Sequence, residues 1–167
     1  MTATFILGGA RSGKSARAQP LAEAAGETRL YIATAEALDV EMEARIARHK
    51  ADRGAGWRTV ETPLDLVAAM EAADAPVVLV DCLTLWLSNL MHHGRDVEAE
   101  SAALCACLGR FEGEVILVSN EVGLGLVPET SLGRAFRDAQ GRLNQRVAAA
   151  CDVVEFVAAG LPLRLKG

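Results

Sequence analysis

Short hydrophobic runs alternate along this chain with longer segments in which apolar and charged residues are mixed. Runs of Val, Ile and Leu of this kind are typical of parallel strands that are buried on both faces. The runs lie at Thr4–Leu7, Leu30–Ala33, Val77–Val80, Val115–Val118 and Val153–Val157. We therefore predict that these segments are strands of a largely parallel sheet.

The segments between the runs are rich in Ala, Leu, Glu and Arg, which favour helices. The predicted helices are Ser15–Ala25, Val40–Arg53, Leu64–Ala73, Val97–Arg110 and Leu132–Ala150. Pro20 is expected to kink or shorten the first helix, because proline has no backbone N–H. Trp57–Glu61 alternates like an edge strand. The alternation of strands and helices predicts an α/β fold in three layers, with a mostly parallel sheet covered by helices on both faces.

Composition narrows the class of protein. The chain has 167 residues, which suggests a single domain over residues 1–167. Hydrophobic residues make up 51% and charged residues 23%, so a disordered chain is excluded. The net charge is −5 and no basic run occurs, which argues against nucleic acid and anionic membranes as partners. The sequence has no membrane-length apolar run and no signal-peptide pattern, so we expect a cytoplasmic protein without stable membrane insertion.

The four cysteines do not have the spacing of a zinc site. Cys105 and Cys107 are separated by a single residue, and no CxxC pair exists elsewhere in the chain. We expect Cys82, Cys105, Cys107 and Cys151 to be buried, reduced thiols.

The strongest motif follows the first strand and matches GxxxxGK[ST] at every required position. Its residues are Gly8, Gly9, Ala10, Arg11, Ser12, Gly13, Lys14 and Ser15. In such a P-loop the glycines let backbone N–H groups point at a phosphate, and the start of the next helix adds positive potential. Lys14 would lie between the β- and γ-phosphates, and the Ser15 hydroxyl would bind Mg²⁺. The alternative is a glycine-rich turn without a ligand.

Acidic residues follow the later strands. Asp81 comes at the end of the Val77–Val80 run, where P-loop proteins place an acid on the magnesium side. The alternative is that Asp81 only caps the helix that follows it. Glu121 is a catalytic base, a substrate contact or a solvated loop residue, and the glycine-punctuated segment Asn120–Glu129 has the composition of a lid or substrate loop. Glu61 either reaches the same ligand or is an exposed edge acid.

A basic helix face surrounds one of the histidines. If Val40–Arg53 is helical, then Arg45, His49 and Arg53 recur every four residues and share a face. Such a face suits a polyphosphate, and nearby cations favour the neutral, nucleophilic form of the imidazole. On spacing alone, a solvated basic face is the favoured interpretation. His92 and His93 precede a glycine and indicate a helix end.

These segments together resemble one enzyme family, the bifunctional adenosylcobinamide kinase / adenosylcobinamide-phosphate guanylyltransferases of cobalamin biosynthesis. The resemblance runs nearly end to end, and its most specific parts are the EMEARIARHK segment around His49 and the SNEVGLGLVPE segment. The segments that carry it are GGARSGKS (8–15), YIATA (31–35), EMEARIARHK (41–50), WRTVE (57–61), VDCLTLWLSN (80–89), SNEVGLGLVPE (119–129), RAFRDAQGRLNQR (134–146) and AGLP (159–162).

The resemblance implies a P-loop fold and two reactions. The γ-phosphate of ATP or GTP moves to the hydroxyl of adenosylcobinamide, and GTP then guanylylates a histidine, from which adenosylcobinamide phosphate takes GMP. The substrates would be ATP, GTP, adenosylcobinamide and its phosphate, with Mg²⁺ as cofactor, and a homo-oligomer is expected. A P-loop kinase with one activity and a nucleotide-binding regulatory module are the alternatives.

The resemblance also assigns roles to particular residues. The nucleophilic histidine falls on His49, and Lys14 acts in both reactions. Arg45 and Arg53 would stabilise phosphate charge during GMP transfer, while Ser15 and Asp81 would hold the metal. Outside the P-loop, the implied nucleotide contacts are Thr34, Ala35, Glu36, Lys50, Ala51, Asp52, Arg53, Glu61, Asp81 and Cys82.

Overall fold

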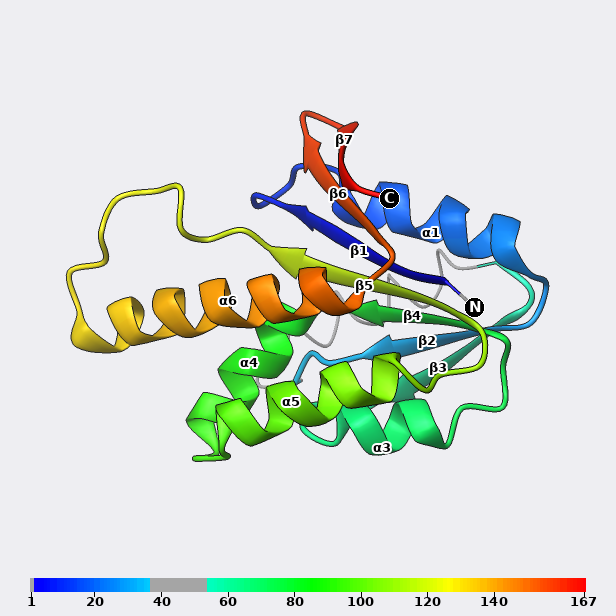
Figure 1. Cartoon of the computed structure of the whole chain (residues 1–167), viewed down its shortest axis with the longest axis horizontal. Helices are drawn as coiled ribbons and strands as arrows, with labels where there is room; N and C mark the ends of the chain where they lie inside the picture. The colour runs from blue at the N-terminus through cyan, green and yellow to red at the C-terminus, as the bar shows by residue number, and fades with distance from the viewer. Residues whose placement is uncertain (1, 37–53) are drawn as a thin grey trace.

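The computed structural model describes residues 2–36 and 54–167. Its strands form one seven-stranded sheet in the order β3-β2-β4-β5-β1-β6-β7 (Figure 1). Every neighbouring pair is parallel except β6 and β7, which are antiparallel. The strands are β1 (Thr2–Gly8), β2 (Arg29–Ala33), β3 (Trp57–Glu61), β4 (Val77–Asp81), β5 (Glu114–Asn120), β6 (Val153–Ala158) and β7 (Leu161–Lys166). The predicted mostly parallel sheet is confirmed.

Helices lie on both faces of the sheet, as expected from the alternating pattern. In the part of the chain that the structure describes, α1 (Lys14–Ala25) covers one face. The other face is covered by α3 (Leu66–Glu71), α4 (Leu83–His92), α5 (Val97–Leu108) and α6 (Ser131–Ala150). None of these helices is long and apolar enough to span a membrane.

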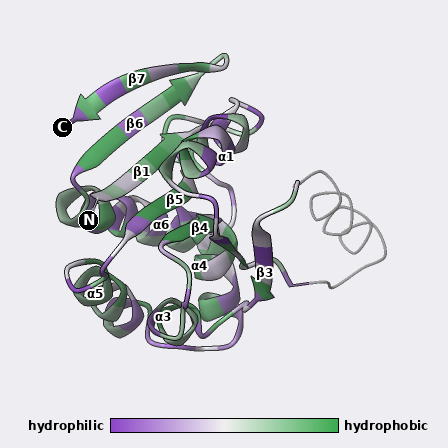
Figure 2. Ribbon diagram, turned by 90° about the vertical axis from the view of Figure 1, so that its right-hand side faces the viewer, coloured by the Kyte–Doolittle hydropathy of each residue, from purple (hydrophilic) through white to green (hydrophobic). Residues whose placement is uncertain are grey.

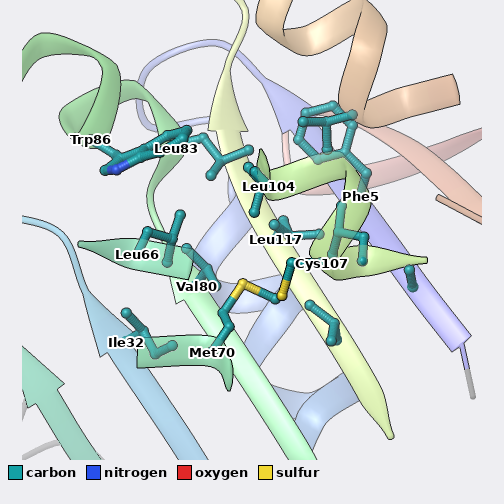
Figure 3. Packing of buried hydrophobic residues seen from close by; sticks show 14 of the residues in the cluster. Phe5, Ile32, Leu66, Met70, Val80, Leu83, Trp86, Leu104, Cys107 and Leu117 are labelled. Carbon is teal, nitrogen blue, oxygen red and sulfur yellow. The ribbon is translucent and has the colours of Figure 1, made fainter. Parts of the chain in front are cut away.

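Alternate residues of the central strands pack into two separate hydrophobic clusters. Ile6, Leu79 and Ile116 pack under α1, whereas Phe5 and Leu117 pack against the helices of the other face. Figure 3 shows Phe5 and Leu117 within the second, larger cluster, and Figure 2 shows that hydrophobic residues dominate the strands between the helical layers. Because the strands are buried on both faces, they read in the sequence as continuous apolar runs.

Two elements differ from the sequence prediction. The sequence analysis implied α4 only through the possible cap at Asp81 and the helix end at His92 and His93, and it gave no bounds, because apolar residues occupy most positions of this helix. The strand β7 was missed, since Pro162 argues against a strand. Proline is tolerated there because β7 lies at the edge of the sheet. The strand predicted at Trp57–Glu61 does form the opposite edge.

The expected effect of Pro20 on the first helix is wrong as regards length. The helix runs through Pro20 to Ala25. Pro20 is exposed, so water can bind the helix carbonyl that loses its N–H partner. The predicted helix Val40–Arg53 lies outside the described residues.

Candidate nucleotide site

The P-loop connects the end of β1 to the start of α1. Gly13 precedes the helix as its N-cap with a φ of 102°, and Arg11 has a φ of 55°. A side chain at Gly8 would place its Cβ 2.4 Å from the carbonyl oxygen of Val157, on the neighbouring strand β6. The loop therefore needs glycine at position 8 for close packing and at position 13 for a left-handed backbone.

The turn between β6 and β7 supports the P-loop from the side. The N–H of Gly160 donates a hydrogen bond of 2.8 Å to the carbonyl oxygen of Ser12. Ala159 and Gly160 both have positive φ angles, of 52° and 79°, which suit a tight hairpin turn. This contact fixes the middle of the loop to an element far away in the sequence.

Lys14 is a buried cation within this loop. Lys14 is only 8% exposed to solvent, and its Nζ donates a hydrogen bond of 2.6 Å to the carbonyl oxygen of Gly9. Burial lowers the pKa of Lys14, while the neighbouring Cys82 and Asp81 act in the opposite direction. A buried ammonium group with so few acceptors has unused capacity to bind an anion.

Asp81 faces the first turn of α1. Its Oδ2 accepts hydrogen bonds from Ser15 Oγ at 3.1 Å and from the hydroxyl of Tyr31 at 3.0 Å. The alternative role for Asp81, as the cap of α4, is wrong: α4 begins after Cys82 and has no side-chain cap. The oxygens of Ser15 and Asp81 are thus brought together at the carboxyl edge of the sheet.

Thr34 and Cys82 clamp the ends of β2 and β4 together. The hydroxyl of Thr34 donates to the carbonyl oxygen of Cys82 at 2.7 Å and accepts from its N–H at 2.9 Å. Asn89 of α4 donates to the carbonyl oxygen of Thr34 at 2.8 Å. Burial raises the pKa of the Cys82 thiol. In this structure Thr34 and Cys82 therefore shape the edge of the site through their mutual bonds.

The remaining predicted residues lie at three places. Ala35 and Glu36 follow Thr34, and the Glu36 carboxylate lies 3.1 Å from Nε2 of His93. Glu61 is exposed at the end of β3, in register with Ala33 on β2. Arg45, His49, Lys50, Ala51, Asp52 and Arg53 lie outside the described residues, so the predicted basic helix face stays a prediction.

Glu121 organises the loop that follows β5. Its Oε1 accepts a hydrogen bond of 2.6 Å from the N–H of Gly123, and its Oε2 accepts one of 3.1 Å from the N–H of Leu124. Its own N–H donates to the carbonyl oxygen of Gly8 at 3.0 Å. These contacts indicate that Glu121 orders the loop next to the P-loop, a role that the sequence analysis did not consider. Farther along the loop, Leu126 is 96% exposed.

Several residues of this site were not singled out individually from sequence. Tyr31 was quoted only as part of a motif, although it is the only tyrosine in the chain and ends in the site. Thr84 and Asn144 contact the end of β5 through their side chains. In the sequence, Thr84 and Asn144 could be noticed only as polar residues within helical segments that also contain apolar residues.

The cysteine expectation is confirmed in most respects. All four cysteines are free thiols; Cys82, Cys107 and Cys151 are buried, and Cys105 is partly exposed. Burial raises the pKa of Cys151 to about 12. In the described part of the chain, no group of three or more His, Cys, Asp and Glu side chains could hold a metal ion.

Solved structures with the same architecture support the fold. A flagellar accessory protein FlaH from Methanocaldococcus jannaschii has a TM-score of 0.57 at 14% identity, covering 99% of this chain and 78% of that one. An ATPase of a bacterial type III secretion system has a TM-score of 0.61 at 11% identity, covering 98% of this chain and 56% of that one. At these identities the likeness concerns the fold alone, which is that of the P-loop NTPases.

Sequence comparison reaches further. A protein of Pseudomonas aeruginosa, the bifunctional adenosylcobalamin biosynthesis protein CobP, is 52% identical over 98% of this chain and 96% of its own length. The bifunctional adenosylcobalamin biosynthesis protein CobU of Salmonella typhimurium is 41% identical over 97% of this chain and 98% of its own. The sequence profile of one family matches residues 4–165. The chain therefore belongs to the cobinamide kinase / cobinamide phosphate guanyltransferase family.

Proposed function

We propose that this chain catalyses both reactions of its family, within a single nucleotide-binding catalytic domain. It transfers the γ-phosphate of ATP or GTP to the hydroxyl of adenosylcobinamide, and then transfers GMP from GTP to the resulting phosphate. The observation that carries the proposal is the meeting of Lys14, Ser15 and Asp81 at one edge of the sheet, in a chain that matches the family over residues 4–165.

For the kinase step, the buried ammonium of Lys14 binds oxygens of the β- and γ-phosphates, and the N-terminal end of α1 adds positive potential. The acceptor hydroxyl oxygen forms a bond to the γ-phosphorus as the bond to the β–γ bridging oxygen breaks. The nucleoside diphosphate leaves, and the hydroxyl proton is released to water. Lys14 thus stabilises charge that develops on the leaving oxygens.

The oxygens of Ser15 and Asp81 fit a magnesium ion. They lie 3.1 Å apart, and Mg²⁺ prefers oxygen ligands. Two protein oxygens suffice, because Mg²⁺ in such sites takes one or two protein ligands and fills its shell with phosphate oxygens and water. When bound, the ion would neutralise charge on the β- and γ-phosphates.

For the second reaction we assign the nucleophile to His49, on the strength of the family resemblance. A ring nitrogen of His49 attacks the α-phosphorus of GTP, and pyrophosphate leaves. A phosphate oxygen of adenosylcobinamide phosphate then attacks the same phosphorus, which yields adenosylcobinamide-GDP and frees His49. The covalent intermediate divides one difficult exchange into two in-line steps. Arg45 and Arg53 would stabilise the charge on the phosphate in both.

The test uses Mg²⁺ and GTP labelled at either the α- or the γ-phosphate. After denaturation, we expect label from the α-position alone to remain on the protein, in a bond that is labile to acid and stable to base. The variant His49→Ala should lose this label and GMP transfer, yet still phosphorylate adenosylcobinamide.

Control variants make the test interpretable. Lys14→Ala should lose both reactions, and His92→Ala, at the exposed last residue of α4, should lose neither. Retention of α-label in His49→Ala would remove the nucleophile role from His49. Absence of label in wild-type protein that still phosphorylates cobinamide would favour a kinase with one activity. Nucleotide binding without either reaction would favour a regulatory module.

A further inference from the structure

The end of β5 lies between the two elements that form the candidate nucleotide site. In the sheet β5 has β1, which leads into the P-loop, on one side and β4, which ends at Asp81, on the other (Figure 1). Asn120 is in register with Gly8, and Val118 is in register with Asp81. Neighbouring strands lie about 4.8 Å apart. Asn120 is therefore the last strand residue between the P-loop and the acid.

The side of the sheet on which Asn120 lies follows from the alternation along β5. Ile116 and Val118 pack in the cluster under α1, whereas the Ser119 hydroxyl is bonded to α6 on the other face. Asn120, two residues after Val118, is thus on the α1 face. This is the face on which Asp81 meets Ser15, at the start of α1.

The backbone of Asn120 is held on both sides by side chains. Its N–H donates to Thr84 Oγ1 of α4 at 2.8 Å, and its carbonyl oxygen accepts from Asn144 Nδ2 of α6 at 3.1 Å. Asn144 Oδ1 in turn accepts from Ser119 Oγ at 2.8 Å and from Gln140 Nε2 at 2.9 Å. This network is largely buried, since Ser119 and Gln140 are inaccessible to solvent. Buried polar networks of this kind rigidify the residue on which they converge.

The side-chain amide of Asn120 itself has no hydrogen-bond partner in the described part of the chain. The helices α4 and α6 therefore fix the main chain of Asn120, while its side-chain N–H donors remain available beside the P-loop. The side-chain amide of asparagine has a neutral NH₂ group with two N–H donors, so it can donate to a phosphate oxygen without adding a further charge beside Lys14.

We propose that Asn120 is a further catalytic residue of phosphoryl transfer, whose Nδ2 donates a hydrogen bond to an oxygen of the terminal phosphate held by the P-loop. The inference rests on the proposed kinase function. As the acceptor oxygen bonds to the γ-phosphorus and the β–γ bridging bond breaks, negative charge stays on the γ-phosphate oxygens, and a fixed donor stabilises it. Thr84 and Asn144 are positioning residues that act through Asn120.

The test compares ATP with ADP, because only ATP carries the phosphate that Asn120 is proposed to contact. In Asn120→Ala we expect the affinity for ATP to fall about tenfold, with the affinity for ADP unchanged, both measured with Mg²⁺ and without acceptor. The kcat for phosphorylation of adenosylcobinamide should fall about 100-fold, the usual effect of removing one such donor. Asn120→Asp should be worse, since it adds negative charge, and Asn144→Leu should reproduce part of the loss.

Controls separate the proposal from misfolding and from failure of the proposed function. Arg110→Ala removes an exposed ion pair with Glu71, away from the site, and should match wild type in every assay. Equal losses for ATP and ADP in Asn120→Ala, or no loss for either, would overturn the inference. If wild-type protein binds ATP but does not phosphorylate adenosylcobinamide, the proposed function fails, and the ATP-to-ADP comparison still decides the role of Asn120.

Discussion

At the scale of single residues, the main feature of the candidate site is the positive charge of Lys14. Lys14 is buried, and its one hydrogen bond in the described structure goes to the carbonyl oxygen of Gly9. Burial lowers its pKa, which means that folding disfavours the charged form. A bound anion therefore offsets the free energy that is lost when folding removes the Lys14 ammonium group from water.

We predict that Lys14→Met stabilises the protein in the absence of nucleotide and abolishes the increase in stability that nucleotide binding gives. Burial of the charged Lys14 lowers the free energy of unfolding at every pH at which the folded protein keeps this side chain protonated. The effect is lost as the pH rises above the ordinary pKa of 10.5, where Lys14 is neutral in both the folded and the unfolded protein. Removal of this cost at neutral pH should raise Tm by about 2–4 °C, which corresponds to about 1 kcal/mol in a chain of this size.

The measurement is thermal unfolding at neutral pH with and without ATP and Mg²⁺. Wild-type protein should gain stability from the nucleotide and the variant should not. A variant that is less stable than wild type without nucleotide would show that the bond from Lys14 to Gly9 outweighs the cost of burial.

At the scale of elements, one carboxylate joins a helix to two strands. Glu155 of β6 accepts a bidentate pair of hydrogen bonds from Arg17 of α1, at 2.8 and 2.9 Å. Arg164 of β7 lies 3.4 Å from the same carboxylate, whose side chain is only 4% exposed. The hydrogen bonds from Arg17 are the main reason why the pKa of Glu155 is lowered, and Arg164 adds to the effect. The three elements that support the P-loop are thereby tied together.

We predict that Glu155→Gln lowers the free energy of unfolding by about 1.5–3 kcal/mol at neutral pH, the usual size for a hydrogen bond to a charged group. Because the folded pKa of Glu155 lies below the ordinary 4.5, its contribution is present above pH 4.5 and is lost as the pH falls through the lowered value. Urea unfolding at pH 7 and at several values below 4.5 should show the difference between the two proteins shrinking. A difference that is constant with pH would contradict this account. As a matched control, Glu71→Gln removes an exposed pair and should have little effect at any pH.

The same scale shows what could be predicted from the sequence. The five central strands were visible because strands buried on both faces are continuous apolar runs, and the P-loop was visible because its glycines and lysine lie at fixed spacing within one short segment. The meeting of Asp81 with Ser15 followed from the rule that parallel strands end at one edge. These features depend on local patterns and on a general rule of topology.

Other features depend on register and packing, which no local pattern encodes. The hydroxyl of Tyr31 meets Asp81 because β2 and β4 are neighbours in a particular alignment. Asn144 reaches Asn120 because side chains of α6 meet the end of β5 in the folded molecule. The strand β7 is held by its pairing with β6, although each of its residues is exposed. Such contacts join residues that are distant in the sequence, so they become evident only in the folded molecule.

At the scale of the whole molecule, the P-loop depends on an element far along the chain. The hairpin between β6 and β7 reaches back, so that Gly160 donates to Ser12 and lies against Gly13. A Cβ at Gly13 would be 3.0 Å from the Cα of Gly160. The shape of the phosphate cradle is thus a property of the assembled sheet rather than of residues 8–15 alone.

We predict that Gly160→Ala weakens both stability and ATP binding. Gly160 has a φ of 79°, a conformation that costs an alanine about 1–2 kcal/mol, although space is open around it. Gly141→Ala is the matched control, because Gly141 lies within α6 with space around it. The control should gain about 0.5–1 kcal/mol, since alanine favours a helix interior. Denaturant unfolding and ATP titration of both variants test this, and identical behaviour of the two would contradict it.

The bond between Gly160 and Ser12 has a consequence for how the protein is made. Synthesis proceeds from the N-terminal side, so the ribosome produces the phosphate-binding motif more than a hundred residues before its supporting hairpin. The strand β1 must also wait for β5 and β6 before it has neighbours on both sides. A growing chain that already carries the complete motif therefore lacks a finished cradle until β6, β7 and the turn between them have been made.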